Sequence, residues 1–174
     1  MTDFRVKKLQ KMFHTFFDVN NDGVLEQADF EQTAERFRSV SGWAAGSPEA
    51  TKTRKVILGL WERLRSKADS DGDGKVTFQE YLAASDAGTT TAFRQDYRDF
   101  FFKVIDDTGD GIIDKDEYLR VFKKFGIDAA ALGDAFDSFT KNGTVPVNAE
   151  YFAQLWKEYF TSNDLNAPGN RFFG

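Results

Sequence analysis

In the segment DSDGDGKVTFQE, Asp69–Glu80, aspartates occupy alternate positions and a glutamate ends a run of twelve residues. Carboxylates crowded into one small loop repel one another, and a bound cation relieves that repulsion. Gly74 stands at the sixth position, where the chain must turn sharply and a Cβ would be costly. This spacing predicts a loop that wraps a calcium ion with oxygen ligands.

Two further segments, Asp18–Asp29 and Asp106–Glu117, follow the same template. Each has oxygen-bearing residues at positions 1, 3, 5 and 12, glycine at position 6 and an aliphatic residue at position 8. Apolar residues at helical spacing precede each loop, and an aromatic residue follows position 12. A single such match is also compatible with a polar turn, but three in register indicate repeated helix-loop-helix units. We therefore predict an all-α fold of four EF-hand units in two pairs, forming one compact globule.

The predicted metal ligands are the residues at positions 1, 3, 5, 7, 9 and 12 of these three loops, position 7 contributing its backbone carbonyl. They are Asp18, Asn20, Asp22, Val24, Glu26 and Asp29 in the first loop; Asp69, Asp71, Asp73, Lys75, Thr77 and Glu80 in the second; and Asp106, Thr108, Asp110, Ile112, Asp114 and Glu117 in the third. Three Ca²⁺ sites follow from this set.

The first loop differs from the others at position 12, where Asp29 is one methylene shorter than the glutamate that chelates calcium with both oxygens. We expect this site to favour six-coordination and to tolerate Mg²⁺.

A fourth segment, Phe139–Glu150, has the loop length and the final glutamate but none of the aspartates. Lys141 offers no oxygen ligand from its side chain, and Pro146 restricts the backbone where an ion site needs conformational freedom. Because EF-hands are built in pairs, we predict that this copy is retained as a structural partner of the third and binds no ion.

Composition narrows the class of protein further. The 174 residues are 41% hydrophobic and include 19 Phe and no Cys, which indicates a real core and excludes disulfides and thiol catalysis. The net charge of −5 argues against a nucleic-acid partner. No stretch resembles a signal peptide or a transmembrane segment, so we expect a cytoplasmic protein. We also expect a monomer.

The distribution of charge leaves a question about partners open. Twelve of the 28 acidic residues are predicted loop ligands, which leaves 16 acidic against 23 basic residues elsewhere. Three divalent ions would reverse the sign of the net charge. Either this reversal moves the protein toward an anionic protein or membrane partner, or the basic face is merely solvated.

Turn-rich breaks divide the chain. The segment SDAGTTTA, Ser85–Ala92, separates a predicted N-terminal pair over residues 1–88 from a C-terminal pair over 89–162. Ser47-Pro48 predicts the start of a helix. The tail, residues 163–174, ends in Phe172-Phe173, which we expect to pack in an apolar cleft between the halves, because exposed phenylalanines would promote aggregation.

Other candidate sites are weaker. His14, the only histidine, has no companion ligand and is expected to be a surface or packing residue. Gly74-Lys75 superficially suggests a phosphate loop, but the remaining residues of that motif are missing. The chain has two methionines, Met1 and Met12, whereas adaptable sensors use methionine-rich grooves.

At family level the chain resembles calexcitin and its relatives among the sarcoplasmic calcium-binding proteins. The resemblance lies in FFDVNNDGVLEQADFE, Phe16–Glu31, in the Gly42-Trp43 turn and above all in LWKEYFTSNDLNAPGNRFFG, Leu155–Gly174. It implies a calcium buffer or calcium signal protein with three working sites and a degenerate fourth. Some insect members are described as juvenile hormone diol kinases, and luciferin-binding relatives carry an apolar ligand. Both remain alternatives here, although this chain lacks a complete phosphate-binding motif.

Overall fold

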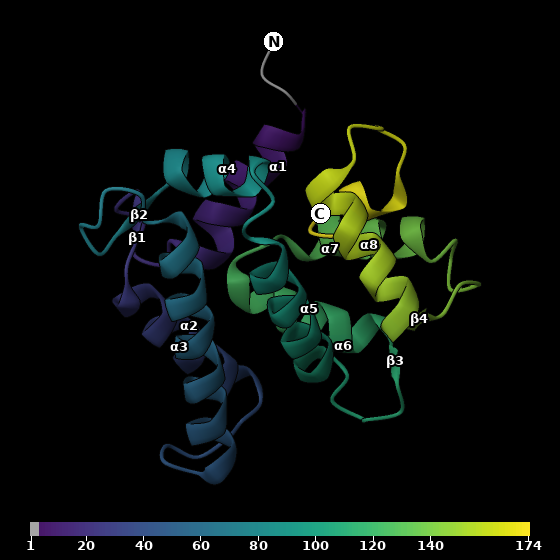
Figure 1. The fold of residues 1–174 in the computed structure, drawn as a ribbon. Coiled ribbons are helices and arrows are strands. Elements are labelled where there is room, and N and C mark those ends of the chain that lie inside the picture. Colours follow the sequence, from purple (N-terminus) through teal and green to yellow (C-terminus); the bar gives the residue numbers. More distant parts are fainter. Residues whose placement is uncertain (1–3) are drawn as a thin grey trace. The chain divides into compact units, whose positions relative to one another are not determined.

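The computed structural model describes residues 4–174, and Figure 1 shows their arrangement. The elements, in chain order, are α1 (Phe4–Met12), η1 (Phe13–Phe17, a π-helical turn), β1 (Val24–Leu25), α2 (Gln27–Val40), α3 (Pro48–Ala68), β2 (Val76–Thr77), α4 (Phe78–Asp86), α5 (Thr91–Ile105), β3 (Ile112–Ile113), α6 (Lys115–Phe122), η2 (Lys123–Phe125), α7 (Ala129–Phe139), β4 (Val147–Asn148), α8 (Ala149–Thr161) and η3 (Pro168–Arg171). The fold is all-α, with four helix-loop-helix units.

Two short antiparallel ladders join the units in pairs. β1 pairs with β2, so that Leu25 lies opposite Val76, and β3 pairs with β4, so that Ile113 lies opposite Val147 (Figure 1). All four of these residues are buried. Each pair thus closes around two aliphatic side chains at the centre of its ladder, as predicted for EF-hand pairs.

The described residues form two compact units. One is Gln10–Tyr97, and the other is Arg98–Gly174 together with the start of the chain up to Leu9. The division falls inside α5, a few residues beyond the Ser85–Ala92 break, and α1 contributes to both units.

Local sequence explains where the helices begin. Ser47 caps α3, its Oγ accepting a hydrogen bond from the Ala50 amide at 3.2 Å, and Pro48 is the first helical residue. In the same way Asp128 caps α7 by accepting from the amides of Ala130 and Ala131. These caps satisfy amides that have no partner within the helix.

Aromatic rings fill the interior of the unit Gln10–Tyr97. Phe17 lies edge-on to Tyr97, with ring centroids 5.3 Å apart, and stacks on Phe30, which contacts Trp61 at 5.1 Å. Edge-to-face pairs at these separations add to the energy of area burial. Phe17 directly precedes the first loop, so this packing fixes where that loop begins.

The C-terminal tail forms part of the interior of the other unit. Phe172 and Phe173 are fully buried, at 1% and 0% exposure. Phe173 lies 4.6 Å from the Tyr159 ring, and the Phe172 carbonyl accepts a 2.6 Å hydrogen bond from the Tyr118 hydroxyl. Tyr118 is the residue that follows position 12 of the third loop, so the tail is bonded directly to the third EF-hand.

A buried lysine ties the start of α1 to the same tail. Lys8 is 5% exposed, and its Nζ donates to the carbonyls of Ser162 at 2.7 Å and Glu158 at 3.3 Å and to the Asn170 side chain. The ammonium group also lies 5.5 Å from the Tyr159 ring centroid. A buried charge is costly unless it is hydrogen-bonded, so these contacts allow Lys8 to remain in the interior.

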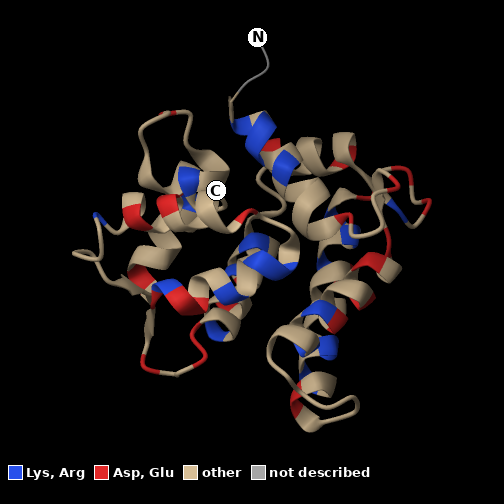
Figure 2. Ribbon diagram, turned by 180° about the vertical axis from the view of Figure 1, so that it is seen from behind, with Lys and Arg blue, Asp and Glu red and all other residues tan. Residues whose placement is uncertain are grey.

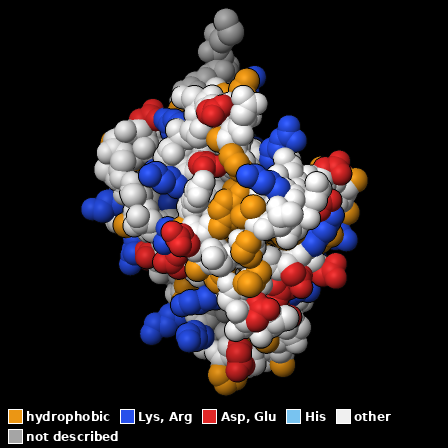
Figure 3. Space-filling view, turned by 90° about the vertical axis from the view of Figure 1, so that its right-hand side faces the viewer, with side chains coloured by type: hydrophobic (Ala, Val, Ile, Leu, Met, Phe, Trp, Pro, Cys, Tyr) orange, Lys and Arg blue, Asp and Glu red, His pale blue; other side chains and the backbone are white. Residues whose placement is uncertain are grey.

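Large hydrophobic side chains are scarce on the surface. Among the described residues they are Val56, Ile112 and Leu165, with exposures of 38%, 44% and 67%. On the face drawn in Figure 3, hydrophobic side chains form a narrow group among charged and polar ones. Within residues 4–174, no helix combines the length and the apolar character needed to cross a membrane.

Replacing Gly169 with alanine should destabilise the protein, because the tail approaches α8 too closely for a side chain. An added Cβ would lie 2.2 Å from the Leu155 carbonyl oxygen and 2.6 Å from the Glu158 Cβ. We expect a loss of about 1–3 kcal/mol in the free energy of unfolding, measured by chemical denaturation.

Gly133→Ala, in α7 of the same unit, is the matched control. Its added Cβ meets nothing closer than 3.7 Å, and alanine is favoured over glycine inside a helix by about 0.5–1 kcal/mol. Equal stability of the two variants would contradict the close approach at Gly169.

Candidate metal centres

Three loops share one pattern of internal hydrogen bonds. They are loop 1 (Asp18–Asp29), loop 2 (Asp69–Glu80) and loop 3 (Asp106–Glu117). The residue at position 1 is an aspartate that directly follows the preceding helix. One oxygen of this aspartate accepts a hydrogen bond from the backbone amide of the glycine at position 6. The pairs are Asp18 with Gly23, Asp69 with Gly74 and Asp106 with Gly111, each at 3.1 Å. These glycines have φ angles of 89°, 86° and 83°, a conformation that side chains disfavour. The turn at position 6 is therefore formed in the same way in all three loops.

The carboxylate at position 12 closes each loop. It accepts from amides near the start of the loop and from the amide at position 9, where the next helix begins. Asp29 accepts from Val19, Asn20 and Glu26, Glu80 from Ser70 and Thr77, and Glu117 from Asp107, Thr108 and Asp114. The two ends of each loop are thus joined through the side chain predicted to chelate the ion.

The remaining predicted ligands lie at their template positions. At position 5, Asp22, Asp73 and Asp110 accept from the amides at position 7, which belong to Val24, Lys75 and Ile112. At position 3, Asn20 and Asp71 accept from the amides of Asp22 and Asp73. At position 9, Glu26, Thr77 and Asp114 are the residues immediately before α2, α4 and α6. Figure 2 shows acidic residues gathered along the loops of both ladders.

Loop 2 brings its carboxylates closest together. One oxygen from each of Asp69, Asp71 and Asp73 lies within 4.8 Å of the others, and among residues 4–174 no other three acidic or histidine side chains come as near. The difference follows from position 3, which is Asn20 in loop 1 and Thr108 in loop 3. Oxygen-only donors around a glycine turn fit a hard divalent cation such as Ca²⁺.

The electrostatics of position 12 differ between loops 1 and 2. Burial raises the pKa of the Asp29 carboxyl, which is 0% exposed, although three backbone amides act in the opposite direction. Burial would also raise the pKa of Glu80, but hydrogen bonds from Thr77 and Ser70 outweigh it and lower that pKa to about 2. The shorter side chain therefore lies in a more enclosed place than its counterpart.

The fourth loop begins one residue later than the sequence alignment predicted. Val147 lies opposite Ile113 in the ladder, which makes it position 8, and α7 ends at Phe139. Asn148 then caps α8 from position 9, accepting from the Tyr151 amide at 2.9 Å. Loop 4 is accordingly Thr140–Tyr151, and the alignment on Phe139–Glu150 was wrong, because it relied on Glu150 instead of the aliphatic position 8.

The corrected register removes the last carboxylate from a ligand position. Glu150 becomes position 11, and position 12 is Tyr151, whose hydroxyl donates to the Phe139 carbonyl at 2.6 Å. Thr140 takes position 1 and is 1% exposed, its Oγ accepting from the Gly143 amide and donating to the Phe136 carbonyl. Loop 4 is held by neutral groups where loops 1 to 3 are held by carboxylates.

His14 lies beside loop 1 without belonging to it. Its Nδ1 is 3.2 Å from a carboxylate oxygen of Asp18, which is itself 1% exposed. The sequence predicts only a surface or packing residue at position 14, so this contact is additional. His14 lies in the π-helical turn η1 and Asp18 directly follows it, and the spacing of four residues is the sequence signal for such a contact.

Gly74 and Lys75 both make contacts within the first EF-hand pair. The Gly74 amide donates a hydrogen bond to the Asp69 carboxylate, and the Lys75 ammonium lies 2.5 Å from the Glu26 carboxylate.

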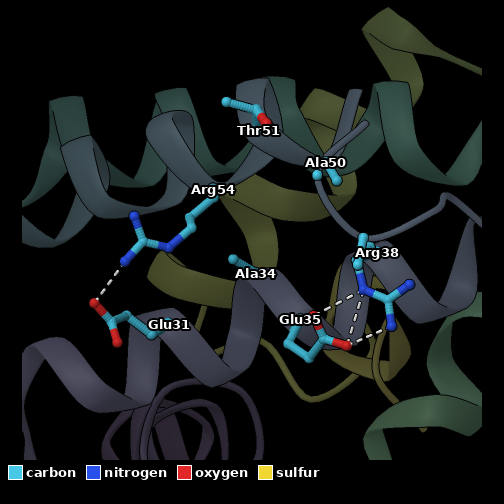
Figure 4. A pocket seen from close by; sticks show the side chains of 9 residues that line it. Glu31, Ala34, Glu35, Arg38, Ala50, Thr51 and Arg54 are labelled. Atoms are coloured by element: carbon cyan, nitrogen blue, oxygen red, sulfur yellow. Dashed lines mark hydrogen bonds and ion pairs between the residues drawn. The ribbon is translucent and has the colours of Figure 1, made fainter. Parts of the chain in front are cut away.

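A hollow of about 260 Å³ lies between α2 and α3 (Figure 4). Its lining includes Ala34 and Ala50 and the ion pairs Glu31–Arg54 and Glu35–Arg38. All four charged side chains of this hollow are thus paired.

Comparisons with known proteins agree with this geometry. The EF-hand domain pair family matches residues 6–85, and an EF-hand family matches residues 98–123. Calexcitin-1 of Caenorhabditis elegans is 31% identical over 98% of this chain and 86% of its own length. The chain belongs to the EF-hand family of calexcitins and sarcoplasmic calcium-binding proteins.

Further members of this family show the same extent of similarity. Sarcoplasmic calcium-binding proteins I, III and IV of Branchiostoma lanceolatum are 28% identical over 100% of this chain and 98% of their own length. The solved structure of a sarcoplasmic calcium-binding protein from amphioxus matches with a TM-score of 0.83 at 25% identity, covering 100% of this chain and 98% of the other. The similarity therefore spans both EF-hand pairs.

The register of loop 4 is tested by two neighbouring substitutions. Tyr151→Phe should cost about 0.5–1.5 kcal/mol of unfolding free energy, because it removes the hydroxyl that donates to Phe139. Glu150→Gln should cost less, about 0.3 kcal/mol at physiological salt, because Glu150 is exposed and its charge acts only on the dipole of the first turn of α8. Thermal or urea denaturation in a chelator measures both. A larger loss of unfolding free energy in Glu150→Gln than in Tyr151→Phe would support the alignment on Phe139–Glu150 instead.

Proposed function

We propose that this protein binds three calcium ions, one in each of loops 1, 2 and 3, and that it acts as a cytoplasmic, monomeric calcium buffer or calcium signal protein. The observation that carries the proposal is the repeated closure of each loop by its position-12 carboxylate. Family membership supports the same activity. Loop 4 would serve only to complete the second pair, since its position-12 residue is a tyrosine.

The interior favours a protein with few partners over a promiscuous adaptor. Met12 is fully buried, and the exposed large hydrophobic side chains are few among the described residues. Adaptable target recognition uses flexible methionines at an exposed groove. The basic excess outside the loops would become dominant on loading, and an anionic partner would then be attracted.

Calcium titration by calorimetry tests the stoichiometry. The unmodified protein should bind three ions, and each isosteric substitution at position 12 (Asp29→Asn, Glu80→Gln or Glu117→Gln) should remove one, because it deletes an anionic ligand. Glu150→Gln is the matched control and should bind three. Four ions would contradict the assignment of loop 4, and fewer than two would overturn the proposed function.

The first site is proposed to be a mixed Ca²⁺/Mg²⁺ site, because Asp29 is short and enclosed. Asp29→Glu should raise the ratio of calcium to magnesium affinity at loop 1 by about tenfold, since a longer carboxylate reaches the larger ion with both oxygens. Glu117→Asp is the reciprocal control and should lower the ratio at loop 3. Titrations in magnesium-free buffer and in about 1 mM magnesium measure both. An unchanged ratio for Asp29→Glu would refute the assignment.

A further inference from the structure

The side chain of Lys75 has no part in the ligand template, yet it lies between two proposed ion sites. Position 7 contributes only its carbonyl to an ion, so its side chain is free for another role. The equivalent residues in loops 1 and 3 are Val24 and Ile112, which carry no charge. A cation at this position is therefore specific to loop 2.

The ladder places Lys75 opposite Glu26. Leu25 pairs with Val76, and the next step along the two antiparallel chains brings Glu26 and Lys75 together. The Lys75 Nζ lies 2.5 Å from Glu26 Oε1, and the two side chains are 48% and 34% exposed. Position 9 of loop 1 is thereby bonded to position 7 of loop 2, and the contact lies within one compact unit.

The ammonium group is bonded to a carboxylate of loop 1, although Lys75 itself belongs to loop 2. The pKa of Lys75 is raised, chiefly by its hydrogen bond with Glu26 and in smaller part by Asp22 of loop 1 and Asp73 of loop 2. Without ions, Lys75 reduces the repulsion among these carboxylates. A divalent ion in either loop would instead repel the ammonium group, and an ion in loop 1 would compete with Lys75 for the negative charge of the Glu26 carboxylate.

We propose that Lys75 is a built-in competitor of calcium that lowers the affinity of loops 1 and 2 and couples their filling. This inference rests on the proposed function. The first ion to bind displaces Lys75 and releases Glu26. The second ion then enters a pair from which the competing charge has already moved, so the two sites fill cooperatively.

The second EF-hand pair provides an internal control. Its ladder places Ile112 opposite Asn148, and Pro146 occupies position 7 of loop 4. No lysine is available at the equivalent positions, so loop 3 should respond only to its own ligands.

The glycine amides at position 6 report each site separately. Gly23, Gly74 and Gly111 each donate to a position-1 carboxylate, so their amide resonances should shift when that carboxylate binds an ion. Calcium titration of the ¹⁵N-labelled full-length protein, followed at these three resonances, therefore yields three affinities from one sample.

Lys75→Met removes the charge while retaining most of the aliphatic chain. We expect the affinities reported by Gly23 and Gly74 to rise about threefold to tenfold, their cooperativity to fall, and the affinity reported by Gly111 to stay unchanged. In a chelator, without metal, the melting temperature should fall, because the carboxylates lose their neutralising partner. If Lys75 had a purely structural role, Lys75→Met would lower both the calcium affinity of loops 1 and 2 and the melting temperature.

Lys52→Met is the matched control, because Lys52 is exposed on α3 and carries the same charge. An equal gain in Lys52→Met, or no gain in Lys75→Met, would overturn the proposal. In a Glu26→Gln background the gain at Gly23 should shrink, and an undiminished gain would also count against it. If the glycine resonances of the unmodified protein do not respond to calcium at all, the proposed function fails, which is a distinguishable result.

Discussion

The position-8 residues face each other across each ladder and hold the two EF-hands of a pair in register. Leu25 faces Val76 and Ile113 faces Val147, and all four are buried. A lone helix-loop-helix unit would leave this apolar edge and its backbone groups exposed. The pairing accounts for a fourth loop without carboxylates, since the third EF-hand needs a partner whether or not that partner binds an ion. It also sets the register that brings Glu26 to Lys75.

The aromatic interior connects the loops to the rest of their units. Phe17 immediately precedes Asp18, and Tyr118 immediately follows Glu117. Both are buried among other rings, and Tyr118 also bonds to the tail through the Phe172 carbonyl. Any change in the geometry of loop 3 on ion binding must be accommodated by this packed cluster, because interiors at native density deform little.

Much of the fold and of the candidate sites could be predicted from sequence, because ligand spacing, the position-6 glycine and the position-8 aliphatic residue are local signals. The fourth loop shows where local signals fail. Glu150 matched the template by chance, and only the pairing of Val147 with Ile113 reveals the shift by one residue. Cap residues carry the same information, since Asn148 stands before α8 as Asp114 stands before α6. The Lys75–Glu26 contact joins residues far apart in sequence and could not be inferred before the ladder register was known.

We propose that loops 1, 2 and 3 hold ions through their carboxylates, while loop 4 closes on itself through hydrogen bonds of Tyr151 and Thr140. Crystals of the full chain grown with calcium, or with a lanthanide in its place, would test it directly through anomalous scattering. We expect three anomalous peaks, each within the residue range of one carboxylate loop, and a Tyr151 hydroxyl still bonded to the Phe139 carbonyl. A peak inside Thr140–Tyr151, or the absence of peaks from the other loops, would contradict it.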